Sequence, residues 1–236
     1  MPVFNSAPAL GELYDRVDAT LSSRRGPGSW ELILVNDGSG DASWERIVSL
    51  SSEHPEVSGL DLTHNFGQHN ALLAGVHSAR HEVIVTLDDD LQDRPEEIPR
   101  LLEALTADID LVYGKPLVKR RTLHRRIATR AMRAMVFALS AGDIPLDIGG
   151  FRSFRASLLN GVDRAQGAHV AIDTLLARSA TGHVAVSVQH EPRRHGRSNY
   201  TLSKLTRHAL TELRSVCLPR THRRRSNPTY VVRRTT

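Results

Sequence analysis

Hydrophobic residues in the first half of the chain recur with two different periods, and the two periods alternate along the sequence. Short apolar runs that end in polar residues predict buried strands, at residues 31–35, 57–62, 83–87 and 111–114. Apolar residues three or four positions apart predict intervening helices, at residues 9–21, 43–50, 68–79 and 96–105. Strands that alternate with helices are typical of an α/β fold, in which a mostly parallel sheet is flanked by helices and joined by right-handed crossovers.

The pattern becomes less regular after residue 114. Further helices are predicted at residues 123–139, 156–162, 170–179 and 201–213, and a strand at residues 184–188. We see no linker that would divide this sequence into two domains. We therefore predict one domain at residues 1–213, followed by a basic tail at residues 214–236 that we expect to be disordered.

Basic residues are concentrated in two parts of the sequence. The formal net charge is +5, but residues 214–236 contain seven arginines and no acidic residue, so the remaining residues sum to −2. A second basic stretch, residues 115–133, can bind phosphates, lie on an anionic membrane or simply be solvated. Aromatic residues make up only 5% of the chain, too few for a surface on which bases stack, so nucleic acid is not an expected partner.

The number of cysteines and the length of the apolar runs indicate in which cellular compartment the chain works. Cys217 is the single cysteine, which excludes a disulfide framework and a thiolate metal cluster and favours a reducing compartment. The sequence shows neither a signal peptide nor an apolar run long enough to cross a bilayer. We expect a cytoplasmic chain that is soluble or associates peripherally with a membrane.

A run of acidic residues follows the predicted strand at residues 83–87. If the chain stays extended there, Asp88, Asp90 and Gln92 point to one side and offer three oxygen ligands for a Mg²⁺ or Mn²⁺ ion that bridges a diphosphate. The alternative is a solvated turn that leads into a helix, with Asp93 as its cap and Pro95 near its first turn. The local pattern leaves both interpretations open, because metal motifs this short often occur by chance.

Five motifs occur in an order that resembles family 2 glycosyltransferases. They are Pro-Val-Phe-Asn-Ser at residues 2–6, Val-Asn-Asp-Gly-Ser at 35–39, Asn-Phe-Gly-Gln at 65–68, the acidic run at 87–96 and Arg-Arg-His-Gly-Arg-Ser-Asn-Tyr at 193–200. The similarity covers about residues 1–212 and is greatest to the branch that includes dolichol-phosphate mannosyltransferase and bacterial polyprenyl-phosphate sugar transferases. Because five ordered motifs are far more specific than one, the resemblance strongly favours the metal interpretation of the acidic run.

The resemblance implies a GT-A fold with a Rossmann-like sheet, and inverting transfer of a sugar from a UDP- or GDP-sugar to a polyprenyl phosphate. Departure of a nucleoside diphosphate builds negative charge on phosphate oxygens, which a divalent cation and nearby arginines stabilise. Asp88, Asp90 and Gln92 would hold this cation, and Asp90 also counts as catalytic. The substrate-binding residues implied near the strand ends are Pro2, Asn5, Asp37, Asp88 and Asp89.

The resemblance implies further site residues, but the sequence patterns around them are less specific. By resemblance Asp37 meets the base or ribose of the donor, and its alternative role is an Asx turn after a strand. Arg126 and Arg130 are candidates for contact with the diphosphate or the acceptor phosphate, and a solvated basic face is the alternative. Arg193 and Ser198 match a family loop that reads Arg-x-x-Gly-x-Ser-Lys-Tyr, here with asparagine in place of the lysine.

The general base has the weakest signal. Some relatives carry an acid where this chain has Gly150, which leaves Asp147 as the nearest carboxylate, and Asp147 can equally cap a loop. A phosphate monoester has a second pKa of about 6 and needs no strong base, so Gly150 favours a polyprenyl phosphate acceptor. The alternatives are transfer to a polysaccharide or other hydroxyl acceptor, and a truncated, inactive nucleotide-sugar-binding module.

Both ends depart from the family pattern. Relatives begin with an apolar strand before the first motif, and Met1 stands where the last residue of that strand would be, so the first strand is truncated. Loss of a central strand costs more than a typical net stability of ~5–15 kcal/mol, so we expect either an upstream start or a product that folds poorly. Many relatives continue into transmembrane helices, whereas the Arg-rich residues here favour peripheral contact with anionic lipid at the inner membrane face.

Overall fold

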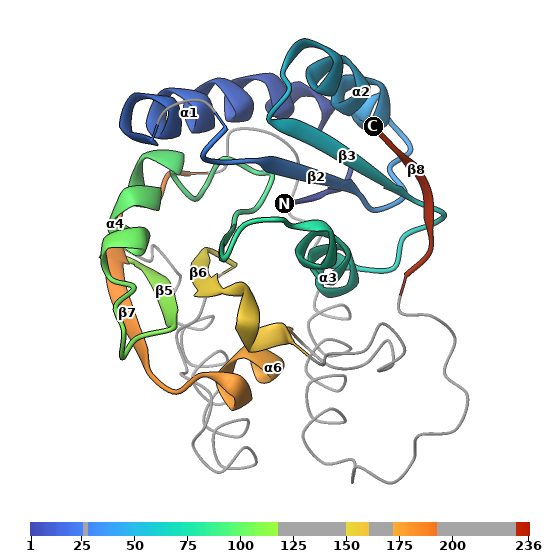
Figure 1. Ribbon diagram of the computed structural model, residues 1–236. Coiled ribbons are helices and arrows are strands. Elements are labelled where there is room, and N and C mark those ends of the chain that lie inside the picture. The colour runs from blue at the N-terminus through green and yellow to red at the C-terminus, as the bar shows by residue number, and fades with distance from the viewer. Residues whose placement is uncertain (26–27, 118–149, 161–171, 193–229) are drawn as a thin grey trace, which may run out of the picture.

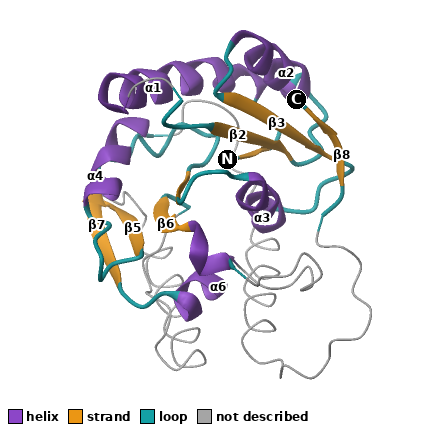
Figure 2. Ribbon diagram, viewed as in Figure 1, coloured by secondary structure: helices purple, strands orange, loops and turns teal. Residues whose placement is uncertain are grey.

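Two β-sheets with helices packed around them make up the described part of the molecule (Figure 1). The computed structural model describes residues 1–25, 28–117, 150–160, 172–192 and 230–236. The first sheet has the strand order β1-β2-β3-β8, and the second has the order β4-β6-β5-β7. Figure 2 shows helices and strands interspersed along the chain, as the alternating periodicity predicts for an α/β protein.

The first sheet consists of three parallel strands and one antiparallel strand. They are β1 (Pro2–Val3), β2 (Leu32–Asn36), β3 (Val57–Leu62) and β8 (Val232–Thr235). The register places Pro2 beside Val35 and Leu32 beside Val57. Every residue of β2 is buried, because a parallel strand covered by helices on both faces has no side that meets solvent.

Three helices cover this sheet: α1 (Ala7–Arg25), α2 (Ser43–Glu53) and α3 (Gln68–Ser78). Leu13 and Val17 of α1, one helical turn apart, share a buried cluster with Leu34 of β2. Ala71 of α3 shares a different cluster with Val35. Since successive residues of a strand point to opposite faces, α1 and α3 lie on opposite faces of β2.

The second sheet is mixed. Its strands are β4 (Val83–Thr86), β5 (Leu111–Pro116), β6 (Arg152–Arg155) and β7 (His183–Val188). β6 runs antiparallel to β4 and to β5, whereas β5 and β7 are parallel. The other elements within the described ranges are two 3₁₀ turns and two helices: η1 (Pro95–Glu97), α4 (Ile98–Glu103), η2 (Ala156–Leu159) and α6 (Ile172–Ser179).

Most predicted strands and helices of the first half are present, with ends that differ by a few residues. β6 was not predicted, and it makes the pairing more mixed than the repeated strand-helix pattern indicates. The predicted helices at residues 123–139 and 201–213 lie outside the described residues. Among the helices of the described ranges, none is long and apolar enough to cross a membrane.

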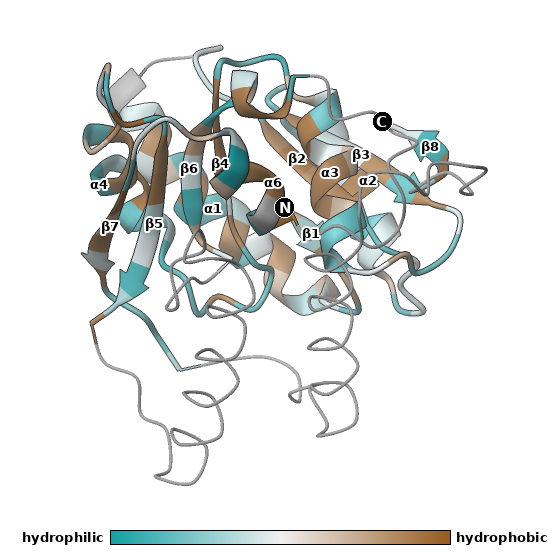
Figure 3. Ribbon diagram, turned by 90° about the horizontal axis from the view of Figure 1, so that it is seen from below, coloured by the Kyte–Doolittle hydropathy of each residue, from teal (hydrophilic) through white to brown (hydrophobic). Residues whose placement is uncertain are grey.

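The end of the chain differs from the disordered tail that we expected for residues 214–236. Its last residues form β8, which pairs with the edge of β3 and lies there in all views (Figures 1 and 3). Arg234 forms an ion pair of 2.8 Å with the buried Asp61, and the Thr236 hydroxyl accepts a hydrogen bond of 2.8 Å from the Gly59 amide. The prediction was wrong for this segment because a composition rich in arginine does not reveal a buried partner carboxylate on another strand.

β1 is only two residues long and lies at the boundary between the two sheets (Figure 1). The Met1 amine donates a hydrogen bond of 2.8 Å to the Ile33 carbonyl, which continues the pairing of β1 with β2. Among the described strands, no ladder joins β1 or β2 to β4, so the sheets remain separate.

Candidate functional site

Hydrogen bonds join the segments that follow β1, β2 and β4. The Phe4 amide donates to Asp89 Oδ2 at 2.9 Å, which connects the first motif to the acidic run. The Asn5 amide donates to Ser39 Oγ at 3.0 Å, and Asn5 Oδ1 accepts from the Gly40 amide at 2.8 Å. Motifs that are far apart in the sequence therefore meet at the carboxyl ends of these strands, where α/β sheets bind ligands.

Asp37 organises the segment after β3. Its Oδ1 accepts a hydrogen bond of 2.7 Å from the Phe66 amide, and its Oδ2 accepts one of 2.9 Å from the Gly67 amide. Burial raises the pKa of the Asp37 carboxyl, and the two amide donors oppose this shift. Gly38 has a φ of 66°, and a Cβ there would lie 2.6 Å from the Asn65 amide nitrogen, so this close approach requires glycine. Asp37 thus positions a loop beside the strand ends.

The acidic run is a turn, not the extended segment from which we argued that Asp88, Asp90 and Gln92 share one side. Residues 89 and 90 are in a turn, and Leu91 has a φ of 57° with its side chain fully buried. Asp90 Oδ1 accepts a hydrogen bond of 3.0 Å from the Gln92 amide. The alternation argument was therefore wrong in its geometry, because strict alternation requires an extended chain and this run contains a turn.

Asp88, the first acidic residue of the run after β4, contacts residues from two other segments of the chain. Its Oδ1 accepts a hydrogen bond of 2.7 Å from Gln68 Nε2 at the start of α3. Burial raises the pKa of the Asp88 carboxyl to about 6, and the negative charges of Asp90 and Asp89 add to the shift. On the other side, a Cβ at Gly150 would lie 2.8 Å from Asp88 Oδ1, so any side chain at that position would crowd the carboxylate.

Asp93 does not cap the following helix, as the alternative interpretation of the run assumed. η1 begins after Arg94 and has no side-chain cap. Asp93 is buried and has an oxygen 3.6 Å from His190 Nε2, next to β7. Burial raises the pKa of its carboxyl to about 7, and the charges of Asp88 and Asp90 contribute. The helix-start interpretation therefore fails for this residue.

Sequence reasoning missed Arg152, the largest fully buried side chain near the site. Its Nε donates a hydrogen bond of 3.1 Å to Thr86 Oγ1, at the end of β4, and its guanidinium forms an ion pair with Asp173 of α6. Its positive charge also acts on Asp88, whose pKa it lowers in part. An arginine within an apolar strand indicates a buried ion pair or hydrogen bond. The partners of Arg152 belong to other elements, so the sequence around Arg152 does not identify them.

The residues present suit a divalent cation that shares its ligands with a substrate. No group of three His, Cys, Asp or Glu side chains in the described ranges forms a metal cage by itself. Asp88, Asp90 and Gln92 offer two carboxylates and an amide, and Mg²⁺ in particular is often held by one or two carboxylates together with phosphate oxygens. Burial raises the pKa values of Asp88 and Asp93, and neighbouring carboxylates add to both shifts, so a cation here would offset part of that negative charge.

Five predicted site residues lie outside the described residues: Arg126, Arg130, Asp147, Arg193 and Ser198. The structure brings together the other predicted residues, from Pro2 in β1 to the acidic run after β4.

Comparison with known proteins shows which family the chain resembles in sequence. Residues 1–163 match the family model described as Glycosyl transferase family 2. The undecaprenyl-phosphate 4-deoxy-4-formamido-L-arabinose transferases of Pectobacterium atrosepticum and Edwardsiella ictaluri are 34% and 33% identical to the chain over 209 and 208 residues. These alignments cover 87% of this chain but only 62% and 63% of the relatives, so the chain spans less than two thirds of their length.

Solved structures resemble the described fold. Glucosyl-3-phosphoglycerate synthase from Mycobacterium tuberculosis, in complex with Mn²⁺ and UDP-glucose, has a TM-score of 0.67 at 19% identity, over 98% of this chain and 83% of that one. A mycobacterial protein has a TM-score of 0.65 at 24% identity, over 93% of this chain and 74% of that one. At such low identity the similarity shows the fold alone, and it confirms the predicted fold class.

Proposed function

Because the chain belongs to glycosyl transferase family 2, we propose that it transfers a sugar, with inversion, from a UDP- or GDP-sugar to a polyprenyl phosphate. The observation that carries this proposal is the Asp88–Asp90 cluster, into which the segments after β1 and β3 are hydrogen-bonded through Phe4 and Gln68. Such a junction at strand ends gives one surface for a nucleotide and an adjacent set of oxygens for its diphosphate.

The donor side of the proposal rests on residues that hold one another in place. Pro2 and Asn5 lie in and just after β1, and Asn5 fixes the loop at Gly40. Asp37 would lie next to the base or ribose, where it already fixes the backbone of residues 66 and 67. Asp89 would act through the Phe4 amide, from which its Oδ2 accepts a hydrogen bond. These contacts would present preformed backbone to the nucleotide and exclude water from it.

Asp88, Asp90 and Gln92 would hold Mg²⁺ or Mn²⁺, and the synthase of similar fold is described with Mn²⁺ and UDP-glucose. When bound, a divalent cation stabilises the negative charge of a departing nucleoside diphosphate. Gln68 would orient Asp88 through its hydrogen bond, and Arg152 would support the end of β4 through its hydrogen bond to Thr86. Both residues would act by positioning the carboxylate.

The acceptor side of the proposal rests on Gly150. A side chain there would crowd Asp88, so this position cannot supply a carboxylate base without rearrangement. A phosphate monoester, with a second pKa of about 6, is already ionised near neutral pH and needs no base. The names of the curated relatives, which are undecaprenyl-phosphate transferases, support the same acceptor class. We predict that Arg126, Arg130, Arg193 and Ser198 contact the donor diphosphate or the acceptor phosphate. A role for Asp147 as the base also stays a prediction.

We place the enzyme at the inner face of the membrane, where basic residues 119–133 and the arginines of residues 214–225 would contact anionic lipid peripherally. A polyprenyl phosphate acceptor would itself be held in that membrane. The second candidate function is transfer to a polysaccharide or another hydroxyl acceptor, and the third is an inactive module that only binds a nucleotide sugar.

Donor turnover with defined acceptors tests the proposal. We expect release of nucleoside diphosphate from a UDP- or GDP-sugar to require both a divalent cation and undecaprenyl phosphate. Asp90→Ala should lower this turnover at least about a hundredfold through loss of electrostatic stabilisation, whereas Asp108→Ala, at an exposed acid in a loop, should leave it unchanged.

The outcomes separate the three candidates. Turnover with an oligosaccharide acceptor but not with undecaprenyl phosphate would favour the second function. A thermal shift with nucleotide sugar and Mn²⁺ but no turnover with any acceptor would favour the binding module. Full activity of Asp90→Ala would show that the metal assignment is wrong.

A further inference from the structure

β8 is the last strand of the first sheet and pairs with the edge of β3 (Figure 1). The two strands are antiparallel, so the amino end of β8 lies beside the carboxyl end of β3. The Thr63 amide continues the pairing, because it donates a hydrogen bond of 3.0 Å to the Val231 carbonyl. The nucleotide of the donor is proposed to bind at the carboxyl ends of β1, β2 and β3, so β8 reaches the border of that site.

A chain of hydrogen bonds connects β8 to the loop after β2. Arg234 donates to Asp61 Oδ2, through Nε at 3.1 Å and through Nη2 at 2.8 Å. Asp61 Oδ1 accepts a hydrogen bond of 2.7 Å from Asn36 Nδ2, and Asn36 Oδ1 accepts one of 3.2 Å from the Ser39 amide. Asp61 therefore joins β8 to the Val-Asn-Asp-Gly-Ser motif at residues 35–39.

The middle of this hydrogen-bond chain is buried. Asn36 and Asp61 are each only 3% exposed, so water cannot readily replace a donor that either of them loses. The Arg234 guanidinium lies over the ring of Trp44, 5.0 Å from its centroid, and this contact favours the direction from which it approaches Asp61. Loss of the guanidinium would remove both donors described for Asp61 Oδ2, and a shift of Asp61 would carry Asn36 with it.

A second contact connects β8 to the loop after β3. The register of the pairing shifts between Asp61 and Leu62, where β8 has one residue more than β3. Arg233 lies at this bulge and donates a hydrogen bond of 3.0 Å to the Thr63 carbonyl. Bulges redirect side chains and are frequent beside functional sites. The bulge here allows two successive arginines of β8 to hold two different segments.

The two loops that β8 reaches also contact each other. Asp37, in the loop after β2, accepts hydrogen bonds from the Phe66 and Gly67 amides in the loop after β3. Thr63 comes three residues before Phe66. A change in either contact of β8 would therefore move the backbone around Asp37, the residue that we place next to the base or ribose.

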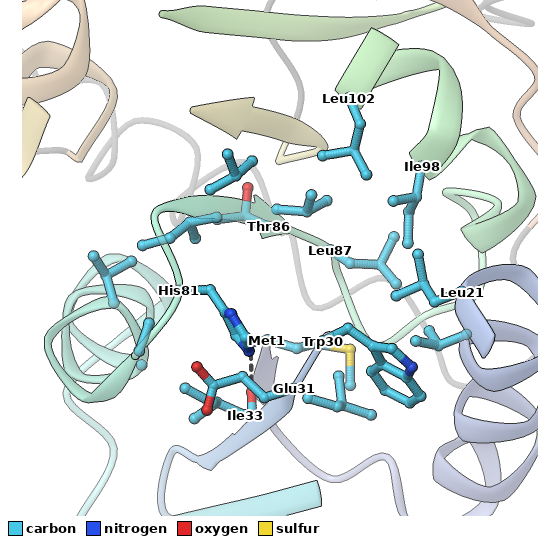
Figure 4. A pocket seen from close by; sticks show the side chains of 18 of the residues that line it. Met1, Leu21, Trp30, Glu31, Ile33, His81, Thr86, Leu87, Ile98 and Leu102 are labelled. Atoms are coloured by element: carbon cyan, nitrogen blue, oxygen red, sulfur yellow. Dashed lines mark hydrogen bonds between the residues drawn. The ribbon is translucent and has the colours of Figure 1, made fainter. Parts of the chain in front are cut away.

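The other edge of β2 has less backbone support. β2 pairs through all its residues with β3, but only its last two pair with β1. Beyond β1 a cavity of about 480 Å³ lies between β2 and β4, with Met1 and Ile33 in its lining (Figure 4). The position of the loop after β2 therefore depends mainly on the side of the sheet that β8 completes.

We propose that β8 is a positioning strand for the nucleotide side of the site, with Arg234 as its main positioning residue. Arg234 acts through Asp61 and Asn36 on the loop after β2, and Arg233 acts on the loop after β3. Together they keep both loops in the conformation that receives the nucleotide of a UDP- or GDP-sugar. The inference rests on the proposed function, because these loops are the ones to which we assign the donor.

Binding of UDP and of GDP to the full chain in the presence of Mn²⁺, measured by calorimetry, tests the proposal. We expect Arg234→Gln to weaken binding of the nucleotide that the parent protein prefers by about three- to tenfold, because ordering of the loops then opposes binding. Arg234→Lys keeps a positive charge beside Asp61 and should recover part of this loss. Hydrogen exchange of the Phe66 and Gly67 amides should become at least about threefold faster in Arg234→Gln.

Thr236→Val is the matched control on the same strand. It removes the hydrogen bond of 2.8 Å that the Gly59 amide donates to the Thr236 hydroxyl, so it also weakens the pairing of β8 with β3. Gly59 lies in the first half of β3, away from the loop that follows this strand. Thr236→Val should therefore lower the urea midpoint of unfolding and leave the nucleotide affinity and the two exchange rates unchanged.

The outcomes separate this inference from the proposed function. Equal nucleotide affinities of Arg234→Gln and Thr236→Val would show that β8 contributes stability alone, and the positioning role would be wrong. If the parent protein binds neither nucleotide, the donor assignment and the positioning role both fail, whereas binding that Arg234→Gln leaves unchanged overturns the positioning role alone. If Arg234→Gln does not fold, weaker nucleotide binding by Arg233→Gln than by Thr236→Val supports the role, and equal binding counts against it.

Discussion

At the scale of single residues, the candidate site contains some side chains that the sequence identifies and others that only the structure reveals. Asp88 and Asp90 were identified as candidates from the order of five motifs along the chain, because a short run of acids after a strand often occurs by chance. Gln68 and Arg152 were not, because their roles come from contacts with residues 20 and 66 positions away. Local pattern identifies the chemistry of the site, and tertiary packing selects the residues that hold it.

Arg152 should contribute strongly to stability. Its guanidinium is buried between Thr86 and Asp173, so Arg152→Met leaves the Asp173 carboxylate without its cation. We expect a loss of about 3 kcal/mol in the free energy of unfolding by urea. The double variant Arg152→Met, Asp173→Leu should recover most of this loss, because it removes both charges.

A control for Arg152 lies on the same strand. Arg155, whose hydrogen bond to the Thr106 carbonyl is exposed, should be replaceable by methionine with little change in stability. Equal stabilities of the Arg152→Met and Arg155→Met proteins would refute a structural role for the buried ion pair.

Asp93 should make the metal-free protein less stable as the pH rises. Its carboxyl has a pKa raised from 3.8 to about 7 in the folded state. Between these values the folded state keeps a proton that the unfolded state has released, so the free energy of unfolding falls as the pH increases through this window. Asp93→Asn removes the titration and should show a smaller fall.

The Asp93 prediction is measured by urea unfolding at pH 5 and pH 7.5 in the presence of EDTA. Asp108→Asn, at an exposed position, should retain the pH dependence of the parent protein. If Asp93→Asn also retains it, the buried carboxyl is not the group that titrates.

At the scale of elements, periodicity predicted the helices and strands that bury a continuous face, and it failed for β6 and β8. β2 and β3 are almost wholly buried and their apolar runs are unambiguous. β6 is a short strand that contains two arginines, and β8 is exposed throughout and carries two more. Both are strands because an existing edge pairs with them, which is information that their own sequences do not contain.

Arg234 should anchor β8 to the sheet. It forms an ion pair with Asp61, whose side chain is only 4% exposed, and lies over the ring of Trp44. Arg234→Gln leaves the Asp61 carboxylate buried with Asn36 as its remaining donor. Because Arg234 itself is half exposed, we expect a loss of about 1–2 kcal/mol in the free energy of unfolding.

The neighbouring residue of β8 provides the comparison. Arg233 donates one exposed hydrogen bond to the Thr63 carbonyl, so Arg233→Gln should cost about 0.5 kcal/mol or less. A larger loss for Arg233→Gln than for Arg234→Gln would show that the register of β8 differs from the one described.

At the scale of the whole molecule, contacts outside the sheets hold the two halves together. Arg16 of α1 donates two hydrogen bonds of 2.8 Å to Glu96 in η1, and it lies 3.4 Å from Glu191 after β7. The pKa of the Glu96 carboxyl is lowered to about 2, mainly by the hydrogen bonds from Arg16. One side chain of the first half therefore binds two acids of the second.

Arg16→Gln should weaken the connection between the halves. Since Glu96 is 42% exposed, solvent screening limits the expected loss to about 1 kcal/mol. The loss should be largest above pH 4.5, where Glu96 is charged in both states, and should vanish as the pH falls toward 2. Arg100→Gln, which removes a local pair with Glu97, is the control and should have little effect at any pH.

The pairing of β8 with β3 also has a consequence for how the protein is made. Gly59 and its hydrogen-bond partner Thr236 are 177 positions apart. At about 5–20 residues per second a ribosome needs roughly 9–35 seconds to add those residues, so the outer edge of β3 waits unpaired for that time. During translation the nascent chain presents a parallel sheet with an open edge, and a chaperone that shields strand edges is the factor on which its yield should depend.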